Sequence, residues 1–279
     1  AAIEIASQND FASVLQRTSS LITPAQPSDV QTAAVRSLGR FSKNRKETAQ
    51  FFFNQWKTLP PPTRREAINL LTGNNESAVL LMGQMKAGHI SPSIMPPIKQ
   101  WVYGRSQVPE IKSLAGELFG KTASSRNAVI EDYLPALSSH TPNHKNGANA
   151  LQKGTCLACH RIGGKGTAVG PDLADVRAKP GVALLTDILD PNRAVEERWI
   201  AYSIELKDGT IATGLIDSED AQSVTLKVPG GVTQTYARSD IETMASTETS
   251  LMPAGLEAAL TPEDMVDLIA VLKAHRASN

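Results

Sequence analysis

The chain has 279 residues, of which 41% are hydrophobic, so it is long enough to form two domains with sizeable cores. Its 28 Lys and Arg residues balance its 28 Asp and Glu residues, and this neutral total gives no indication of a nucleic acid or a membrane surface as partner. Because no stretch approaches the roughly 18 consecutive apolar residues of a membrane span, we expect no span in this chain.

The first part of the chain, from about residue 29 to residue 137, has the apolar spacing of helices. One apolar stripe covers residues 30–38, a similar one covers residues 65–71 about 33 positions later, and a third covers residues 108–119. Helix pairs that recur at such a spacing predict a HEAT-like α-solenoid, which we place at residues 1–140. An irregular helical bundle is the alternative.

A polar stretch over residues 138–149 contains Pro142 and Gly147, which predicts a linker between two domains. A short helix over residues 148–153 then leads into the second domain, which we place at residues 141–279.

The chain has only two cysteines, and they form a C-x-x-C-H motif from Cys156 through Cys159 to His160. This motif is the attachment signature of a c-type haem, since two thiols at this spacing can each add to a vinyl group of one haem while His160 binds the iron. A zinc half-site, a thioredoxin-like redox pair and chance are the alternatives. Zinc needs about four ligands, and a redox pair is expected near a βαβ pattern rather than before the glycine-rich residues 163–170.

The segment Gly170-Pro171-Asp172-Leu173 follows the motif. We expect His160 to bind the iron through one ring nitrogen while its other nitrogen is held by a carbonyl, and the carbonyl of Pro171 is our candidate. An ordinary Gly-Pro turn is the alternative. Leu173, together with Leu184, Leu185 and Ile188 of a helix over about residues 182–189, is expected to keep water from the porphyrin.

After this helix the pattern changes to short alternating segments with turn signals at Asp208-Gly209, residues 217–221 and Gly230-Gly231. Five antiparallel strands are predicted, over residues 199–206, 210–216, 223–228, 232–237 and 241–244. Strands of this kind are enough to close a small β-barrel, inserted at about residues 198–245. Helix resumes at Thr261-Pro262, with an apolar stripe at Met265, Leu268, Ile269 and Leu272.

Met252 is our candidate for the second axial ligand of the iron. It stands in Ser250-Leu251-Met252-Pro253-Ala254-Gly255, a loop that can continue neither strand nor helix. Of the six methionines, Met82, Met85 and Met265 fall in apolar helical stripes, Met95 lies in a proline-rich loop of the other domain and Met244 ends a strand. A buried loop anchor is the alternative role for Met252.

Other polar residues have weaker cases. His140 and His144 are interpreted as solvated, with a metal pair or a distal ligand as the alternative, and His89 and His275 are interpreted as surface residues. Four residues are candidates to hydrogen-bond haem propionates, with ordinary packing as the alternative: Arg193, Arg198, Trp199 and Tyr202.

Six segments together resemble the planctomycete and verrucomicrobial type of haem-binding cytochrome c domain. They are residues 156–160, Gly170-Pro171-Asp172-Leu173, Asp190-Pro191-Asn192-Arg193-Ala194-Val195, Lys207-Asp208-Gly209-Thr210, residues 250–256 and residues 267–272. The resemblance covers about Gly147 to Arg276. It implies a class I cytochrome c fold with a β-domain inserted before the methionine loop, and His/Met ligation by His160 and Met252. The preceding helices resemble the HEAT-like segment that often precedes this domain.

The resemblance and the motif together predict a mainly α protein with one covalently attached haem c that transfers single electrons. The expected partner is a redox protein, such as a sugar or alcohol dehydrogenase or another cytochrome, or a dehydrogenase module on the same polypeptide. The alternative is a haem enzyme or gas sensor, peroxidase-like, whose sixth ligand is displaceable. Because haem attachment implies export and no basic-then-apolar leader stands at Ala1, we expect a mature or trimmed form of a periplasmic or otherwise exported protein.

Overall fold

The computed structural model describes residues 10–23, 26–120 and 125–274. The chain is mainly α-helical with a five-stranded antiparallel sheet, which confirms the expected class. It divides into two compact units. The first unit comprises Ala1–Ala123, Ala194–Leu226 and Gln234–Thr249, and the second comprises Ser124–Arg193, Lys227–Thr233 and Ser250–Asn279.

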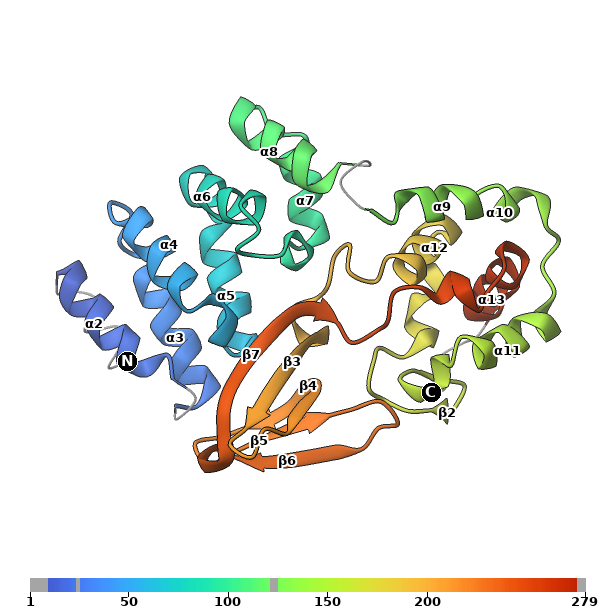
Figure 1. Ribbon diagram of the computed structural model, residues 1–279. Helices are drawn as coiled ribbons and strands as arrows, with labels where there is room; N and C mark the ends of the chain where they lie inside the picture. Colours follow the sequence, from blue (N-terminus) through green and yellow to red (C-terminus); the bar gives the residue numbers. More distant parts are fainter. Residues whose placement is uncertain (1–9, 24–25, 121–124, 275–279) are drawn as a thin grey trace. The chain divides into compact units, whose positions relative to one another are not determined.

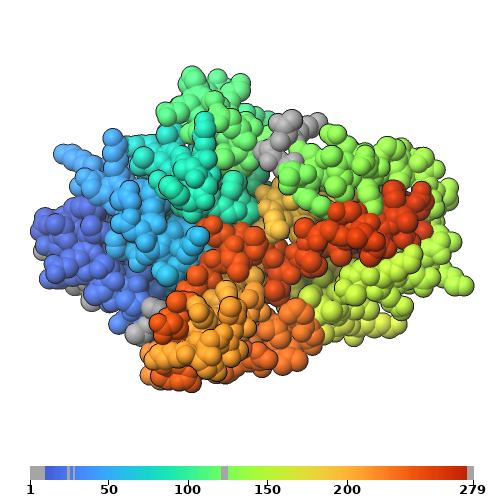
Figure 2. Space-filling view, in the orientation of Figure 1, coloured from blue at the N-terminus to red at the C-terminus, as the bar shows by residue number. Residues whose placement is uncertain are grey.

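The helices of the first unit follow one another along the chain in a stack (Figure 1). They are α2 (Phe11–Leu21), α3 (Ser28–Leu38), α4 (Arg45–Asn54), α5 (Pro61–Leu71), α6 (Asn75–Lys86), α7 (Pro97–Gly104) and α8 (Pro109–Phe119), with short 3₁₀ turns η1 (Trp56–Thr58) and η2 (Pro92–Ile94). Helix α3 packs on α5, α4 on α6, and α6 on α8, so each of these helices contacts the next but one. In the space-filling view of Figure 2 the atoms of α2 to α6, coloured blue to blue-green, pack against one another.

A buried stripe on each helix holds this stack together. Ala34, Val35 and Leu38 of α3 are inaccessible to solvent or nearly so, as are Ala67, Ile68 and Leu71 of α5. Met82 and Met85 of α6 are also buried, and Met95 is completely buried in the same core. The predicted apolar stripes around residues 30–38 and 65–71 are therefore confirmed.

All five predicted strands are present. They are β3 (Ile200–Leu206), β4 (Ile211–Glu219), β5 (Ser223–Lys227), β6 (Thr233–Ala237) and β7 (Ile241–Ser250), preceded by the 3₁₀ turn η5 (Glu197–Trp199). Strands β3 and β4 form an antiparallel hairpin in which Tyr202 lies opposite Gly214 and Ile204 lies opposite Ala212. Strand β7 is longer than predicted, because it continues beyond Met244 to Ser250.

The strand order is β6-β5-β4-β3-β7, so β6 and β7 are the two outer strands of an open order. The 3₁₀ turn η6 (Arg238–Asp240) joins these outer strands directly, which brings the two edges together at one corner. The structure thus shows the five antiparallel strands expected between the haem-motif segment and the methionine loop. Strand β6 is short and mostly exposed, but its Tyr236 packs with Ile241 and Met244 of β7 against a small buried cluster formed by Ile204, Val224 and Leu226.

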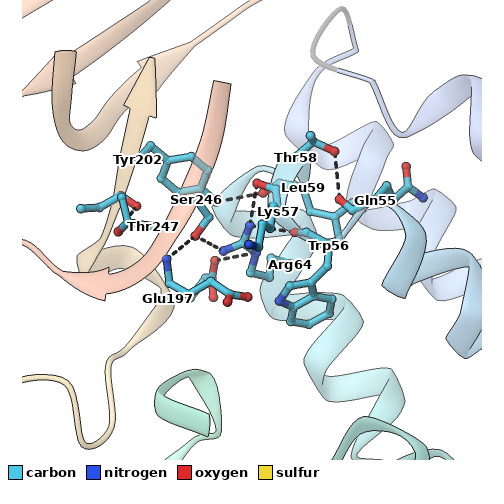
Figure 3. Close-up of polar contacts among 12 residues, drawn as sticks. Gln55, Trp56, Lys57, Thr58, Leu59, Arg64, Glu197, Tyr202, Ser246 and Thr247 are labelled. Carbon is cyan, nitrogen blue, oxygen red and sulfur yellow. Dashed lines mark hydrogen bonds and ion pairs between the residues drawn. The ribbon is translucent and has the colours of Figure 1, made fainter. Parts of the chain in front are cut away.

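A buried polar cluster links helices and sheet within the first unit (Figure 3). The guanidinium of Arg64 in α5 is completely buried, and its Nη2 donates to the carbonyl oxygens of Trp56 and Lys57 at 2.8 and 3.0 Å. Its Nη1 donates to the Ser246 hydroxyl of β7, and its Nε lies 3.6 Å from a carboxylate oxygen of Glu197. One arginine thus contacts both a helix connection and the sheet.

The second unit is built from short helices. These are α9 (Asn127–Tyr133), α10 (Ala136–Ser139), α11 (His144–Lys153), α12 (Gly181–Leu189) and α13 (Pro262–Ala274), with 3₁₀ turns η3 (Cys156–Ala158), η4 (Leu173–Ala178) and η7 (Leu256–Ala258) and the two-stranded hairpin β1 (Arg161–Ile162) and β2 (Lys165–Gly166). The predicted stripe of α13, from Met265 to Leu272, is buried in its core. The Thr261 hydroxyl accepts from the Asp264 amide at 3.2 Å, as expected for its cap.

Helices α11 and α13 cross at Gly147. A Cβ atom at Gly147 would lie 2.1 Å from the Asp267 carbonyl oxygen and 2.6 Å from Cγ2 of Val271, so only glycine permits this approach. The two helices bracket the candidate site in sequence, because α11 precedes Cys156 and α13 follows Met252.

The division of the chain differs from the one predicted. Helices α9 and α10 lie in the second unit, where Ile130 and Tyr133 pack in its core, although we placed residues 1–140 in the first domain. The five strands cluster with the first unit except for the β5–β6 turn. The linker expected at residues 138–149 already contains the first turn of α11, which begins at His144 because the Asn143 side chain caps it.

Within the residues that the structure describes, no helix has the length and apolar character needed to cross a bilayer.

Candidate functional site

The two cysteines lie on a single helical turn, η3. The amides of Cys159 and His160 both donate to the Cys156 carbonyl, at 3.2 and 2.9 Å, so positions 156 and 159 share one face of the turn. Thr155, which precedes the turn, has a left-handed backbone with φ of 51°. Both thiols are free and half-buried.

The electrostatics of the thiols bear on the alternative of a redox pair. Burial raises the pKa of Cys156 and also that of Cys159, so both sulfurs are protonated at neutral pH. A thioredoxin-like pair has one thiol with a lowered pKa, which makes it a nucleophile. The raised pKa values therefore count against a thioredoxin-like disulfide-exchange pair.

The His160 imidazole is held in a fixed orientation. Its Nδ1 lies 2.8 Å from the Pro171 carbonyl oxygen, which is the contact that we predicted from the sequence. A neutral imidazole that donates from Nδ1 has its Nε2 lone pair available to a metal.

Glycine shapes the space beside this imidazole. A Cβ atom at Gly170 would lie 2.6 Å from Cε1 and 2.9 Å from Nδ1 of His160. The amides of Val169 and Gly170 donate to the Cys159 carbonyl at 3.0 and 2.7 Å, which keeps this segment against the motif. The backbone at Gly170 thus packs so closely against the His160 ring that only glycine fits at this position.

A hairpin that the sequence analysis missed closes the motif loop. Strands β1 and β2 are joined by Gly163 and Gly164, whose φ angles of 55° and 76° suit a two-residue hairpin turn. The Thr167 amide then donates to the carbonyls of Leu157 and His160 at 3.1 and 3.2 Å. The Gly163-Gly164 pair was the available signal, and we interpreted it only as a loop.

Met252 packs in the same core as the motif. It is half-buried, and it shares the apolar cluster of the second unit with Cys156, Leu157 and Leu173. The same cluster contains the predicted pocket residues Leu184, Leu185 and Ile188. Of the rival methionines, Met265 is completely buried on α13 and the others belong to the first unit.

The turn between β5 and β6 also contacts the motif. The Gly230 amide donates to the Ala158 carbonyl at 2.7 Å, and the Thr167 hydroxyl donates to the same oxygen at 2.6 Å. A Cβ at Gly231 would lie 3.2 Å from Cβ of Thr167. No local pattern predicted this contact, because it joins segments far apart in the sequence.

The histidines outside the motif are arranged differently from what was expected. His140 is not simply solvated, because its Nε2 lies 2.9 Å from a carboxylate oxygen of the buried Asp267. It ends α10, whereas His144 begins α11 and is exposed, so the two do not share one helix. His89 is exposed as expected, and His275 lies outside the described residues.

Most of the residues predicted to hydrogen-bond haem propionates lie in the first unit and contact other residues there. Tyr202 is completely buried and donates to the Leu59 carbonyl at 2.8 Å, and Arg198 pairs with Glu196, so both pack within the first unit. Trp199 packs against the core of the same unit. Arg193 alone belongs to the second unit, where it pairs with Asp190.

The structure also bears on the alternative of a zinc site. In the described segments there is no cluster of three or more His, Cys, Asp or Glu side chains suited to hold a metal ion.

Comparison with models of known protein families finds no match for this chain. A search of curated protein sequences likewise finds none that is significantly similar.

Proposed function

We propose that this chain is a c-type cytochrome that holds one covalently attached haem through Cys156 and Cys159, with His160 and Met252 as the two axial ligands. The observation that carries the proposal is the orientation of His160. Its ring is fixed between the Pro171 carbonyl and the backbone of Gly170, directly after two protonated thiols on one turn. This donor set fits a haem c.

Each residue has a defined chemical task in this proposal. Cys156 and Cys159 would hold the haem through two thioether bonds, each formed by adding a thiol across one vinyl group, with the sulfur on one vinyl carbon and the thiol hydrogen on the other, so that no oxidant or reductant would be consumed. His160 would offer Nε2 to the iron while Pro171 holds Nδ1. The thioether of Met252 would favour ferrous iron and raise the reduction potential. When bound, the haem would supply a reversible one-electron couple.

The finer fold assignment is part of this proposal. The crossing of α11, which precedes the cysteine motif, with α13, which follows Met252, supports a class I cytochrome c fold with the β-strands inserted before the methionine loop. The stacking of each helix on the next but one supports a HEAT-like first unit that acts as a scaffold or docking surface. A dehydrogenase or another cytochrome would be the redox partner, and haem attachment would place the protein in the periplasm or another exported location.

The test begins with the full chain produced together with a haem-attachment system. We expect a mass increase of one haem that resists acid extraction, and a visible spectrum of c type. Cys156→Ala/Cys159→Ala is the control, and it should lose the covalent haem. A wild-type protein that acquires no covalent haem would overturn the proposal.

Axial ligation is tested on the same sample. We expect the weak far-red absorption band of ferric iron bound to sulfur, and no change of the ferrous spectrum on addition of carbon monoxide. Met252→Ala should lose the band and bind carbon monoxide. If the wild-type protein behaves like Met252→Ala, the open site of a sensor or a peroxidase-like enzyme replaces the electron carrier.

A further inference from the structure

The loop that carries Met252 has little regular structure of its own. It runs from Leu251 to Gly255, between the end of β7 and the 3₁₀ turn η7. A methionine side chain has three rotatable bonds, so it does not by itself define where its sulfur lies. Whatever fixes the backbone of this loop therefore decides whether the thioether reaches a metal.

Two hydrogen bonds in series hold the start of the loop. The Ser250 amide donates to Oδ1 of Asn192 at 2.8 Å, and the Met252 amide donates to the Ser250 hydroxyl at 3.1 Å. All three residues belong to the second unit. The side chain of Asn192 thus connects the chain after α12 to the backbone of Met252 through a single intervening residue.

The segment that carries Asn192 is itself held firmly. Arg193 closes a turn on Asp190 through its amide at 3.0 Å and through its Nε at 3.1 Å to a carboxylate oxygen. Asp190 is buried, and Arg193 also donates to the side chain of Asn127 at the start of α9. The methionine loop is therefore hydrogen-bonded to a turn that is itself held in place by side-chain contacts.

The far end of the loop is anchored to the same region. Arg126 pairs with Glu257 and donates from Nε to the Leu189 carbonyl at 3.0 Å. The Tyr133 hydroxyl donates to the Leu260 carbonyl at 2.6 Å. Residues around α9 and the end of α12 thus hold both ends of the loop.

We infer that Asn192, acting through Ser250, is a positioning residue that holds the thioether of Met252 on the iron. This inference rests on the proposed function, because it concerns the sixth ligand of the haem. It gives a role to Asn192, for which the sequence suggested none beyond the resemblance of its segment. Loss of the tether leaves the Ser250 amide without its acceptor and lets the loop leave the iron more readily.

The test uses the full-length protein with its haem attached and measures how tightly the ferric form binds imidazole, which competes with Met252. We expect Asn192→Ala to bind imidazole about fivefold more tightly than the wild type, equivalent to about 1 kcal/mol for one lost hydrogen bond. The far-red band should weaken in parallel. Asn192→Asp keeps an acceptor oxygen and should restore the wild-type affinity.

A matched control separates positioning from general stability. Asn143→Ala makes the same change at the cap of α11, where the side chain accepts from the amides of Lys145 and Asn146. It should lower the melting temperature and leave imidazole affinity unchanged. If both variants raise the affinity equally, or if Asn192→Ala leaves it at the wild-type value, the tether does not position Met252.

Two further measurements keep the outcomes distinct. If Asn192→Ala fails to mature, Ser250→Ala removes only the second bond of the series and should also tighten imidazole binding, whereas an unchanged affinity would count against the tether. The wild-type spectrum separates the two proposals. If the wild type shows the far-red band and the variants keep the wild-type imidazole affinity, only the tether is refuted. If the wild type lacks the band, the His/Met proposal on which the tether rests is refuted as well.

Discussion

Gly170 lies so close to His160 that a Cβ atom on the glycine would approach Cε1 of the imidazole to 2.6 Å. Real Cβ contacts essentially never reach this distance. The ring cannot move away freely, because its Nδ1 is held by the Pro171 carbonyl at 2.8 Å. Glycine is therefore required here by the close packing of the backbone against the His160 imidazole.

We predict that Gly170→Ala displaces the His160 ring. The substitution should lower the yield of covalently attached haem, since the imidazole must break its bond to Pro171 or shift the backbone of the motif. Visible absorbance per polypeptide measures the yield. Gly181→Ala is the matched control, because a Cβ there would meet nothing closer than 3.9 Å. Equal yields for the two variants would contradict the prediction.

We predict that Gly147→Ala forces α11 and α13 apart. The added methyl group would overlap both the Asp267 carbonyl and Val271, and overpacking of this kind costs about 1–3 kcal/mol. Unfolding of the second unit, followed by the visible absorbance of the attached haem, measures the loss. Adding Val271→Ala should not restore stability, because the closer obstacle is a backbone oxygen at 2.1 Å. Full recovery in the double variant would contradict this account.

We predict that Arg64→Met destabilises the first unit by about 3–5 kcal/mol, the usual cost of breaking a buried ion pair from one side. Above pH 7, where the Glu197 carboxyl with its pKa of about 7 is ionised, the substitution leaves that buried carboxylate without its cation, and it also removes the donors to two carbonyls. Denaturant unfolding followed by tryptophan fluorescence measures the loss, because Trp56, Trp101 and Trp199 all lie in this unit. Combining it with Glu197→Gln should recover part of the stability, and a single variant as stable as the wild type would refute the prediction.

We predict that the stability of the first unit falls as the pH rises from about 5 to about 7. Burial raises the pKa of Glu197 to about 7 from its ordinary value of 4.5, an effect that Arg64 and Arg65 oppose and the Glu248 carboxylate reinforces. The folded state therefore binds more protons than the unfolded state in this range, and ionisation costs on the order of 3 kcal/mol once the pH exceeds the folded pKa.

Denaturant unfolding at a series of pH values tests this sign. Glu197→Gln should flatten the profile between pH 5 and about 7, since the amide has no proton to lose at the position whose pKa is about 7. Glu242→Gln changes an exposed glutamate of β7 and should keep the wild-type profile. If the stability of the wild type rises between pH 5 and about 7, the prediction is wrong. The ion pair with Arg64 would then outweigh the effect of burial on the Glu197 carboxylate.

The sequence by itself determined the features that depend on neighbouring residues. The turn that carries the motif follows from the spacing of Cys156 and His160. The contact between His160 and the Pro171 carbonyl was predictable because the two residues are only 11 positions apart. The five strands follow from alternation and turn residues, because side-chain period and turn chemistry are local properties. The apolar stripe of α13 was predictable for the same reason.

Only the tertiary structure decided which distant polar groups meet. Arg64 and Ser246 are 182 positions apart, His140 and Asp267 are 127 apart, and Asn192 and Ser250 are 58 apart. A buried or half-buried polar group needs a partner, yet nothing in the spacing of the chain says which one it finds. The assignment of α9 and α10 to the second unit has the same origin, because amphipathic helices show that they bury a face without showing against what.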